Sequence, residues 1–255
     1  MHMRRCFAGG ILIVGLLASA GCAGTPSSVG SASATATSTS PQVDRPAVDA
    51  DTIRGPGLSV DFDASPSVAG VVSRNKVAFS GTVKGWRDGR TIESGPKSQY
   101  KTQILSAVLV VAVDTSYGGT PVTGNAYVQV VRGMFHSDSS GNIDRSRYTY
   151  REVTDLEKAA PVGVRVTVIG VPAATDEALA QDGDVITPAP DVPADADVFQ
   201  VDPQGLLFED ADGSYVSGYA PDSDVIVGDW PGADGTDTPP TYDALLSALR
   251  STSAS

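Results

Sequence analysis

The chain of 255 residues carries 30 acidic and 18 basic side chains, which gives a formal net charge of −12. A balance this acidic makes nucleic acid, itself a polyanion, a poor target. With only 2 cysteines and 2 histidines, the composition excludes a disulfide-dense scaffold.

The N-terminal segment has the order of an export signal. Arg4 and Arg5 supply a positive start, and the apolar stretch Phe7–Leu17 is too short to span a bilayer as a stable helix. Small residues then lead up to Cys22, as a signal-peptide cleavage site requires.

The sequence Leu17-Ala18-Ser19-Ala20-Gly21-Cys22 resembles the bacterial lipoprotein signal, with Ser19 where Leu or Val is usual. The resemblance implies that residues 1–21 are removed and that Cys22 is diacylated on its sulfur. The protein would then be anchored by this lipid to the extracytoplasmic face of the cell membrane. An ordinary secretory signal with a chance cysteine, or an uncleaved anchor, are the alternatives. Since Cys6 leaves with the signal, the mature chain has no cysteine pair.

Two regions follow the signal. Residues 22–56 are rich in Ser, Thr, Ala and Pro, so they bury too little apolar surface to offset the entropy of ordering, and we predict a flexible tether. Residues 57–255 are predicted to form a single mainly β domain with an acidic C-terminal extension. The low Lys content and abundant Ala, Gly, Val and Asp resemble an actinobacterial proteome.

Three strands are predicted in the first half of the domain. Val77–Trp86 is rich in Val, Phe and Trp, and Ala126–Val131 has a similar character. Ile104–Val113 is more continuously apolar, which predicts burial on both faces over part of its length. Tyr117–Pro121 is predicted to be a loop because of its glycines and proline.

The second half begins with a predicted short helix, Glu152–Ala160, ended by the proline that follows. Val162–Val171 alternates as a strand. Val198–Glu209 and Tyr215–Ser217 are predicted strands joined by a hairpin at Asp210–Gly213, where Asp and Gly tolerate positive φ.

The C-terminus is predicted to be an amphipathic helix. Its apolar side chains Tyr242, Leu245, Leu246 and Leu249 follow the helical period, and Thr241 is the expected N-cap. We expect this helix to dock its apolar stripe onto the sheet.

The order of these elements resembles the OB-fold, a five-stranded Greek-key barrel with a helix before its fourth strand. The sequence Pro161–Gly170 is similar to the fourth strand of such barrels, and the resemblance covers Val77–Glu209. We therefore expect a small OB-like β-barrel. A β-sandwich with a C-terminal helix is the alternative.

The acidic residues are concentrated in the second half. From Val171 onward Arg250 is the one basic residue, against seventeen Asp and Glu. One interpretation is solvated loops that keep an exported protein soluble. The other is a weak calcium site, although Asp210–Gly213 lacks the later ligands of a calcium loop and no ligands can be named.

The chemistry of most enzyme classes is missing from the sequence. His136, placed in a predicted exposed loop at 134–138, is the one histidine of the mature chain, so several histidines cannot converge on zinc. No Gly-x-Ser-x-Gly, phosphate-loop or dinucleotide motif occurs. We predict no catalytic residue, cofactor or metal.

A carboxylate pair of the kind that glycosidases use stays open as an alternative, because such pairs are assembled in space by the fold. Each glutamate is nevertheless explained as a surface, helix-start or strand-edge residue: Glu93, Glu152, Glu157, Glu177 and Glu209.

Aromatic and basic residues occur together in the first half, as they do in OB-folds that bind single strands. The aromatic residues are Trp86, Tyr100, Tyr127, Tyr148 and Tyr150, and the basic residues are Lys84, Arg87, Arg90, Lys97 and Lys101. Since the chain is acidic and exported, we expect the aromatics to fill the barrel. The basic half could face anionic envelope material.

The sequence thus predicts a non-catalytic binding or envelope-interaction module of unknown ligand, with a cell-wall polymer or envelope protein as a possible partner. A carboxylate-dependent hydrolase of envelope glycans or esters is the alternative.

Overall fold

The computed structural model describes residues 45–55, 62–94, 102–136, 140, 142, 150–181, 183–233 and 240–253. These residues belong to one compact unit, Val43–Ser255. The predicted signal, Cys22 and most of the predicted tether lie outside the described residues.

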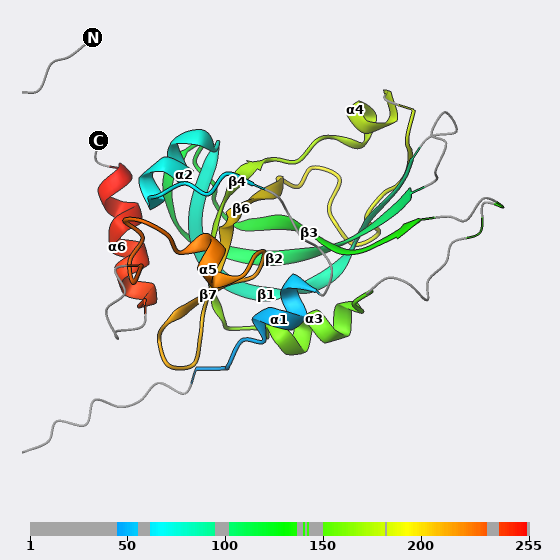
Figure 1. The fold of residues 1–255 in the computed structure, drawn as a ribbon. Coiled ribbons are helices and arrows are strands. Elements are labelled where there is room, and N and C mark those ends of the chain that lie inside the picture. The colour runs from blue at the N-terminus through cyan, green and yellow to red at the C-terminus, as the bar shows by residue number, and fades with distance from the viewer. Residues whose placement is uncertain are drawn as a thin grey trace, which may run out of the picture. The chain divides into compact units, whose positions relative to one another are not determined.

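Five strands close a barrel (Figure 1): β1 (Val77–Glu93), β2 (Thr102–Gly119), β3 (Asn125–His136), β4 (Arg165–Pro172) and β6 (Val198–Glu209). They follow one another in the order β1-β2-β3-β6-β4, and the pairing of β4 with β1 completes the ring. All neighbours are antiparallel except β3 and β6, which run parallel where Tyr127 pairs with Val198. Helix α3 (Val153–Ala159) lies between β3 and β4 in the chain.

This strand order is that of the OB-fold, so the predicted OB-like barrel is confirmed and the sandwich alternative is not. The barrel is filled by side chains that alternate inward along each strand, such as Phe79, Leu109 and Val168. Trp86 also lies inside, where its indole N–H donates to the carbonyl of Ala160 over 3.1 Å. The prediction that aromatic residues fill the barrel therefore holds for Trp86, but it is wrong for Tyr127, which packs in a separate cluster outside the barrel core.

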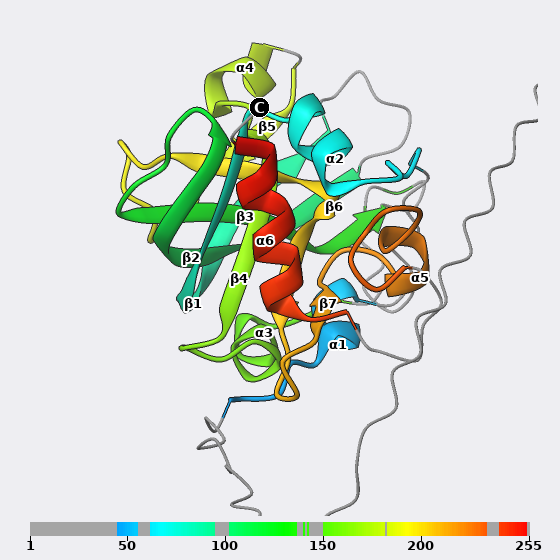
Figure 2. The same ribbon diagram turned by 90° about the vertical axis from the view of Figure 1, so that its left-hand side faces the viewer.

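A second layer covers the outer face of β1, β4 and β6 (Figure 2). It comprises α2 (Val68–Arg74), β7 (Tyr215–Ser217), α5 (Asp222–Val225) and α6 (Tyr242–Ser253). The outward-facing Ala78, Ile169 and Leu207 are buried beneath it. All four residues of the predicted stripe on α6 are buried, and Thr241 caps the helix by accepting from the Ala244 N–H over 3.2 Å.

The first strands are longer than predicted. Tyr117–Gly119 belongs to β2 and not to a loop, because the Tyr117 ring is buried and its hydroxyl meets that of Ser80 at 2.8 Å. His136 is the last residue of β3, where it is exposed as expected, and its Nδ1 lies 3.1 Å from the Thr102 hydroxyl. The cross-strand pairing that extends these strands is not visible in their own composition.

The folded chain also begins earlier than predicted. Residues 45–55, assigned to the flexible tether, include helix α1 (Ala50–Arg54), whose Ile53 is fully buried. Asp49 caps this helix by accepting from the Thr52 N–H over 3.0 Å. Arg54 pairs with Asp222 over 2.6 Å, and the Val48 N–H donates to Asp210 over 3.0 Å. One aliphatic side chain and several polar links to distant residues therefore order a segment whose composition predicts disorder.

Candidate functional site

The connection from β4 to β6 crosses the outside of the barrel. We call residues 173–197 the strap; its described part contains α4 (Asp176–Gln181) and β5 (Val185–Thr187). β5 adds to the end of β1, with Ile186 opposite Ile92. At the C-terminal end of the strap the Tyr127 N–H donates to the Asp197 carbonyl over 3.2 Å. The strap is thus attached at its middle and at its end to strands that build the barrel.

The strap buries an apolar face that would otherwise be exposed. Val108 and Val110 of β2 and Tyr127 of β3 point out of the barrel, yet they are buried. Val192 and Ala196 of the strap pack against them. The next residues along β2, such as Leu109, point into the barrel core. The predicted burial of this strand on both faces is confirmed, and the strap is its cause.

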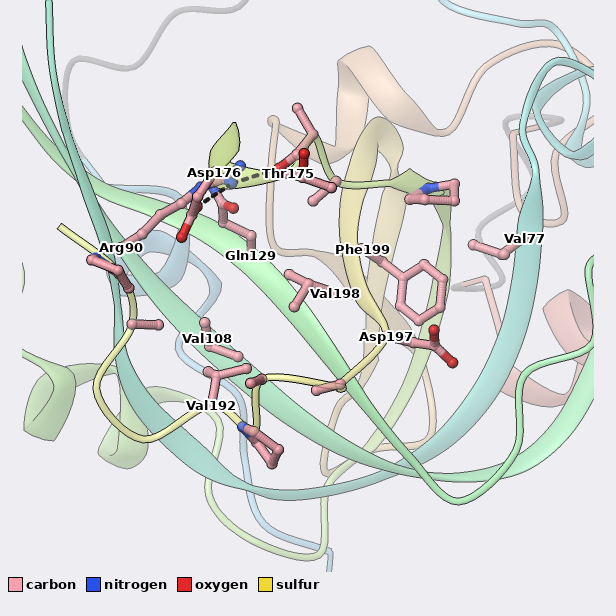
Figure 3. Close-up of a pocket in the computed structure, with 18 of the residues that line it drawn as sticks. Val77, Arg90, Val108, Gln129, Thr175, Asp176, Val192, Asp197, Val198 and Phe199 are labelled. Carbon is pink, nitrogen blue, oxygen red and sulfur yellow. Dashed lines mark hydrogen bonds and ion pairs between the residues drawn. The ribbon is translucent and has the colours of Figure 1, made fainter. Parts of the chain in front are cut away.

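A cavity of about 710 Å³ lies between the strap and this face of the barrel. Its volume falls within the range of roughly 300–1,000 Å³ that is typical of small-molecule sites. In Figure 3 the central part of the cavity is apolar, lined by Val108, Val192 and Val198. Phe199, Val77 and Asp197 lie toward one end, and Arg90, Thr175 and Asp176 lie toward the other.

Arg90 is the basic residue of the lining. Its Nη1 donates to Asp176 Oδ1 over 3.1 Å and to the Ala174 carbonyl over 2.6 Å (Figure 3). These bonds tie β1 to the start of the strap, and the side chain is only 12 % exposed. Its Nε is buried and has no hydrogen-bond partner in the part of the chain that the structure describes. A buried donor without an acceptor is costly, so this atom is where an incoming acceptor would gain most.

A second polar side chain is held in position beside Arg90. Gln129 of β3 lines the cavity and donates from Nε2 to the hydroxyl of Ser106 on β2 over 3.2 Å. Thr175 caps α4 by accepting from the Ala178 N–H over 3.2 Å. The polar end of the cavity is therefore built from side chains of β1, β3 and the strap that are fixed by hydrogen bonds.

The aromatic and basic residues singled out from the sequence do not form one surface. Arg87 donates to the Asp191 carbonyl of the strap and lies over the Tyr127 ring at 6.0 Å. Arg87 and Arg90 therefore hold the strap, and Lys84 is exposed on β1. Tyr150 lies under the Arg132 guanidinium at 5.0 Å. The remaining predicted residues fall outside the described ranges: Tyr100, Tyr148, Lys97 and Lys101.

The carboxylates outside the cavity each make their own structural contacts. Asp210 accepts from the Val48 N–H over 3.0 Å, and Asp212 accepts from the Ser214 N–H over 2.8 Å, so both shape the predicted hairpin turn. Glu209 is buried between Arg45 at 3.3 Å and Arg165 at 3.1 Å. Within the described residues, no group of three or more His, Cys, Asp or Glu is placed to hold a metal ion.

Two of the three carboxylates that line the cavity lie at opposite ends of it. Asp176 is paired with Arg90, and Asp197 lies toward the opposite end in Figure 3. Glu177, the third lining carboxylate, is exposed. A glycosidase needs two carboxyl groups that face one another across the scissile bond.

Comparison of the chain with protein-family models, with characterised proteins and with solved structures finds no significant match. Among the helices of the described residues, none is long and apolar enough to cross a membrane. The candidate site therefore rests on its own geometry. The sequence does not predict this site, because the acidic residues of the strap favour a solvated loop. The available signal is the few apolar residues among the acids, such as Val185, Ile186 and Val192.

Proposed function

We propose that this protein is a lipid-anchored binding module on the extracytoplasmic face of the membrane, which holds a small ligand between the strap and the barrel. The observation that carries the proposal is the cavity of about 710 Å³ over β2 and β3. A mainly apolar lining with a few fixed polar groups is the usual composition of a small-molecule site.

The position of the cavity in the fold supports the same proposal by analogy. OB-folds commonly bind their ligands on the face of strands two and three, beside the loop between strands four and five. Here that loop is the strap, and it packs onto Val108, Val110 and Tyr127. The strap packs over part of this face and leaves a partly open cavity of about 710 Å³, a volume that fits a small molecule. We therefore favour a small ligand over a cell-wall polymer.

The anchor is a separate part of the proposal and rests on the resemblance of residues 17–22 to the lipoprotein signal. In the full chain, Cys22→Ser removes the sulfur to be acylated. We expect the wild type to fractionate with membranes and the variant to lose both the lipid mass and this association. Equal membrane association of the two proteins contradicts the anchor.

The cavity is tested with Nile red, a neutral dye whose emission rises in apolar surroundings. The protein is the mature chain, residues 22–255, carrying Cys22→Ser so that it stays in solution. We expect saturable binding of one dye per chain. Ala189→Phe fills the cavity from the strap and should abolish binding, because Ala189 lines the cavity. Ala180→Phe is the matched control, since Ala180 is exposed on α4 and does not line the cavity.

Absence of saturable binding, or an equal effect of the two phenylalanine variants, contradicts the proposal. Urea unfolding of each variant verifies that the barrel is intact. The hydrolase alternative has no observation in its favour, since Asp176 is paired with Arg90 and Asp197 lies toward the opposite end of the cavity.

A further inference from the structure

We infer that the ligand of the cavity is a neutral amphiphile with a single acyl chain. Its ester or amide carbonyl lies at the Arg90 end of the cavity, and its chain runs toward Phe199. This inference rests on the proposed function, because it names the ligand class of the same cavity.

The centre of the cavity selects a hydrocarbon chain. Val108, Val192 and Val198 line it and offer no hydrogen-bonding side-chain atom. A polar group placed there would lose its bonds to water without replacement, whereas CH₂ groups gain from leaving water. Figure 3 shows Arg90 and Phe199 on opposite sides of these valines, so the apolar part connects two ends and suits an extended chain.

The Arg90 end selects an acceptor oxygen. Arg90 Nη1 already binds Asp176 and the Ala174 carbonyl, while the buried Nε lacks an acceptor among the described residues. A carbonyl oxygen of the ligand would supply that acceptor once the start of the strap shifts to admit it. The side chain of Gln129, fixed by Ser106, offers a further hydrogen-bonding group at this end.

The charges around the cavity select a neutral head group. Asp176 already balances Arg90, and the other lining carboxylates, Glu177 and Asp197, add negative charge at the surface. An anionic head would meet this negative potential. A cationic head would meet the guanidinium and leave Nε without an acceptor. A neutral carbonyl avoids both conflicts.

The test is displacement of Nile red from the mature Cys22→Ser chain by three series of matched chain length: monoacylglycerols, fatty acids and alkylammonium salts. All are used below the concentrations at which they form micelles. We expect the affinity of the monoacylglycerols to rise roughly fourfold with each added CH₂ and to level off when the chain fills the cavity. At equal chain length the fatty acids should bind more weakly by roughly fivefold or more. The ammonium compounds should also bind more weakly than the esters.

The position of the carbonyl is tested with Arg90→Lys, which keeps a positive charge facing Asp176 and removes the Nε donor. We expect roughly tenfold weaker binding of the monoacylglycerol, and little change for an n-alkane of equal chain length, which has no acceptor atom. Equal or tighter binding of the charged compounds, or an equal effect of Arg90→Lys on ester and alkane, overturns the ligand class and leaves the cavity as a binding site. If Nile red itself does not bind, or is indifferent to Ala189→Phe, the proposed function fails instead.

Discussion

The side chain of Gln204 binds the backbone of Ser65 with both of its polar atoms. Its Oε1 accepts from the Ser65 N–H over 2.6 Å, and its Nε2 donates to the Ser65 carbonyl over 3.1 Å. Nε2 also donates to the carbonyl of Val225 over 2.9 Å, and the Trp230 indole donates to the Ser65 carbonyl over 3.0 Å. One fully buried amide on β6 thereby joins the segments before α2 and around α5 to the barrel.

Removing this amide should destabilise the second layer. In Gln204→Leu the Ser65 N–H and the Val225 carbonyl lose their side-chain partner while still buried, at a cost of about 1–3 kcal/mol for each group left unsatisfied. We expect the free energy of unfolding, measured in urea, to fall by about 3 kcal/mol. Gln200→Leu is the control, because Gln200 is exposed on the same strand, and it should change stability by no more than about 0.5 kcal/mol. Similar losses in both variants would refute this role for Gln204.

Asp202 should make stability depend on pH in acid. Burial acts to raise the pKa of this carboxyl, but hydrogen bonds from Arg74, Asn75 and the Gln204 N–H outweigh it, so the pKa lies below its ordinary value. Such a group stabilises the fold above its unfolded-state pKa of about 3.9, and this contribution is lost as the pH falls through the folded-state pKa.

We therefore expect the wild type to lose more stability than Asp202→Asn between about pH 5 and pH 2, measured by urea unfolding at a series of pH values. At neutral pH the variant should be the less stable protein, because an amide cannot accept the two bonds from Arg74, of 2.9 and 2.8 Å, with both of its atoms. Arg74→Met should flatten the same part of the curve by removing those donors. Parallel curves for wild type and Asp202→Asn contradict the prediction.

Two glycines with the same backbone conformation should respond differently to alanine. Gly55 has φ +71° and Gly124 has φ +72°, both in the left-handed region. A Cβ at Gly124 meets open space, whereas one at Gly55 would lie 2.6 Å from Cζ of Arg151. That guanidinium is held in place by the carbonyls of Thr52 and Val131, and although burial lowers the pKa of Arg151 to about 10, it stays charged at neutral pH.

We expect Gly124→Ala to cost about 1 kcal/mol for the strained backbone alone. Gly55→Ala should cost about 2 kcal/mol more, because the buried charge must shift away from its acceptors. Thermal and urea unfolding of the two variants measure the difference. Equal costs would show that Arg151 moves freely.

A ligand that reaches the buried Nε of Arg90 should require the strap to move. Ile92 and Ile186 are opposite one another in the antiparallel pair of β1 and β5, so cysteines at both positions are placed to form a disulfide. The mature Cys22→Ser chain has no other cysteine. We expect oxidation of the Ile92→Cys, Ile186→Cys protein to slow Nile red binding and a reductant to restore the rate. An unchanged rate in the oxidised protein would mean that the ligand enters without release of β5.

The sequence by itself determined those elements whose signals are local. The bounds of β6 and β7, the turn between them, α3 and the buried stripe of α6 follow from apolar periodicity, Asp-Gly turn chemistry and helix capping within a few residues. The order of these elements favoured an OB-like barrel but left a sandwich open, and the pairing of β4 with β1 decided for the barrel. The lipid anchor at Cys22 stays a prediction of the sequence.

Only the tertiary structure decided what covers each surface. The segment around Ile53 is ordered although its composition predicts disorder, because Ile53 is buried. Distant residues also accept hydrogen bonds from its neighbours: Asp210 from the Val48 N–H, and Asp222 from Arg54. An apolar residue such as Val108 predicts burial, but the sequence does not show whether a core, the strap or a ligand buries it. Arg90 is a basic residue in the sequence like its neighbours, and it becomes a site residue only because Asp176, far along the chain, is brought against it. Contacts between residues remote in sequence leave no periodic trace in either segment, so the cavity could be found only in the folded chain.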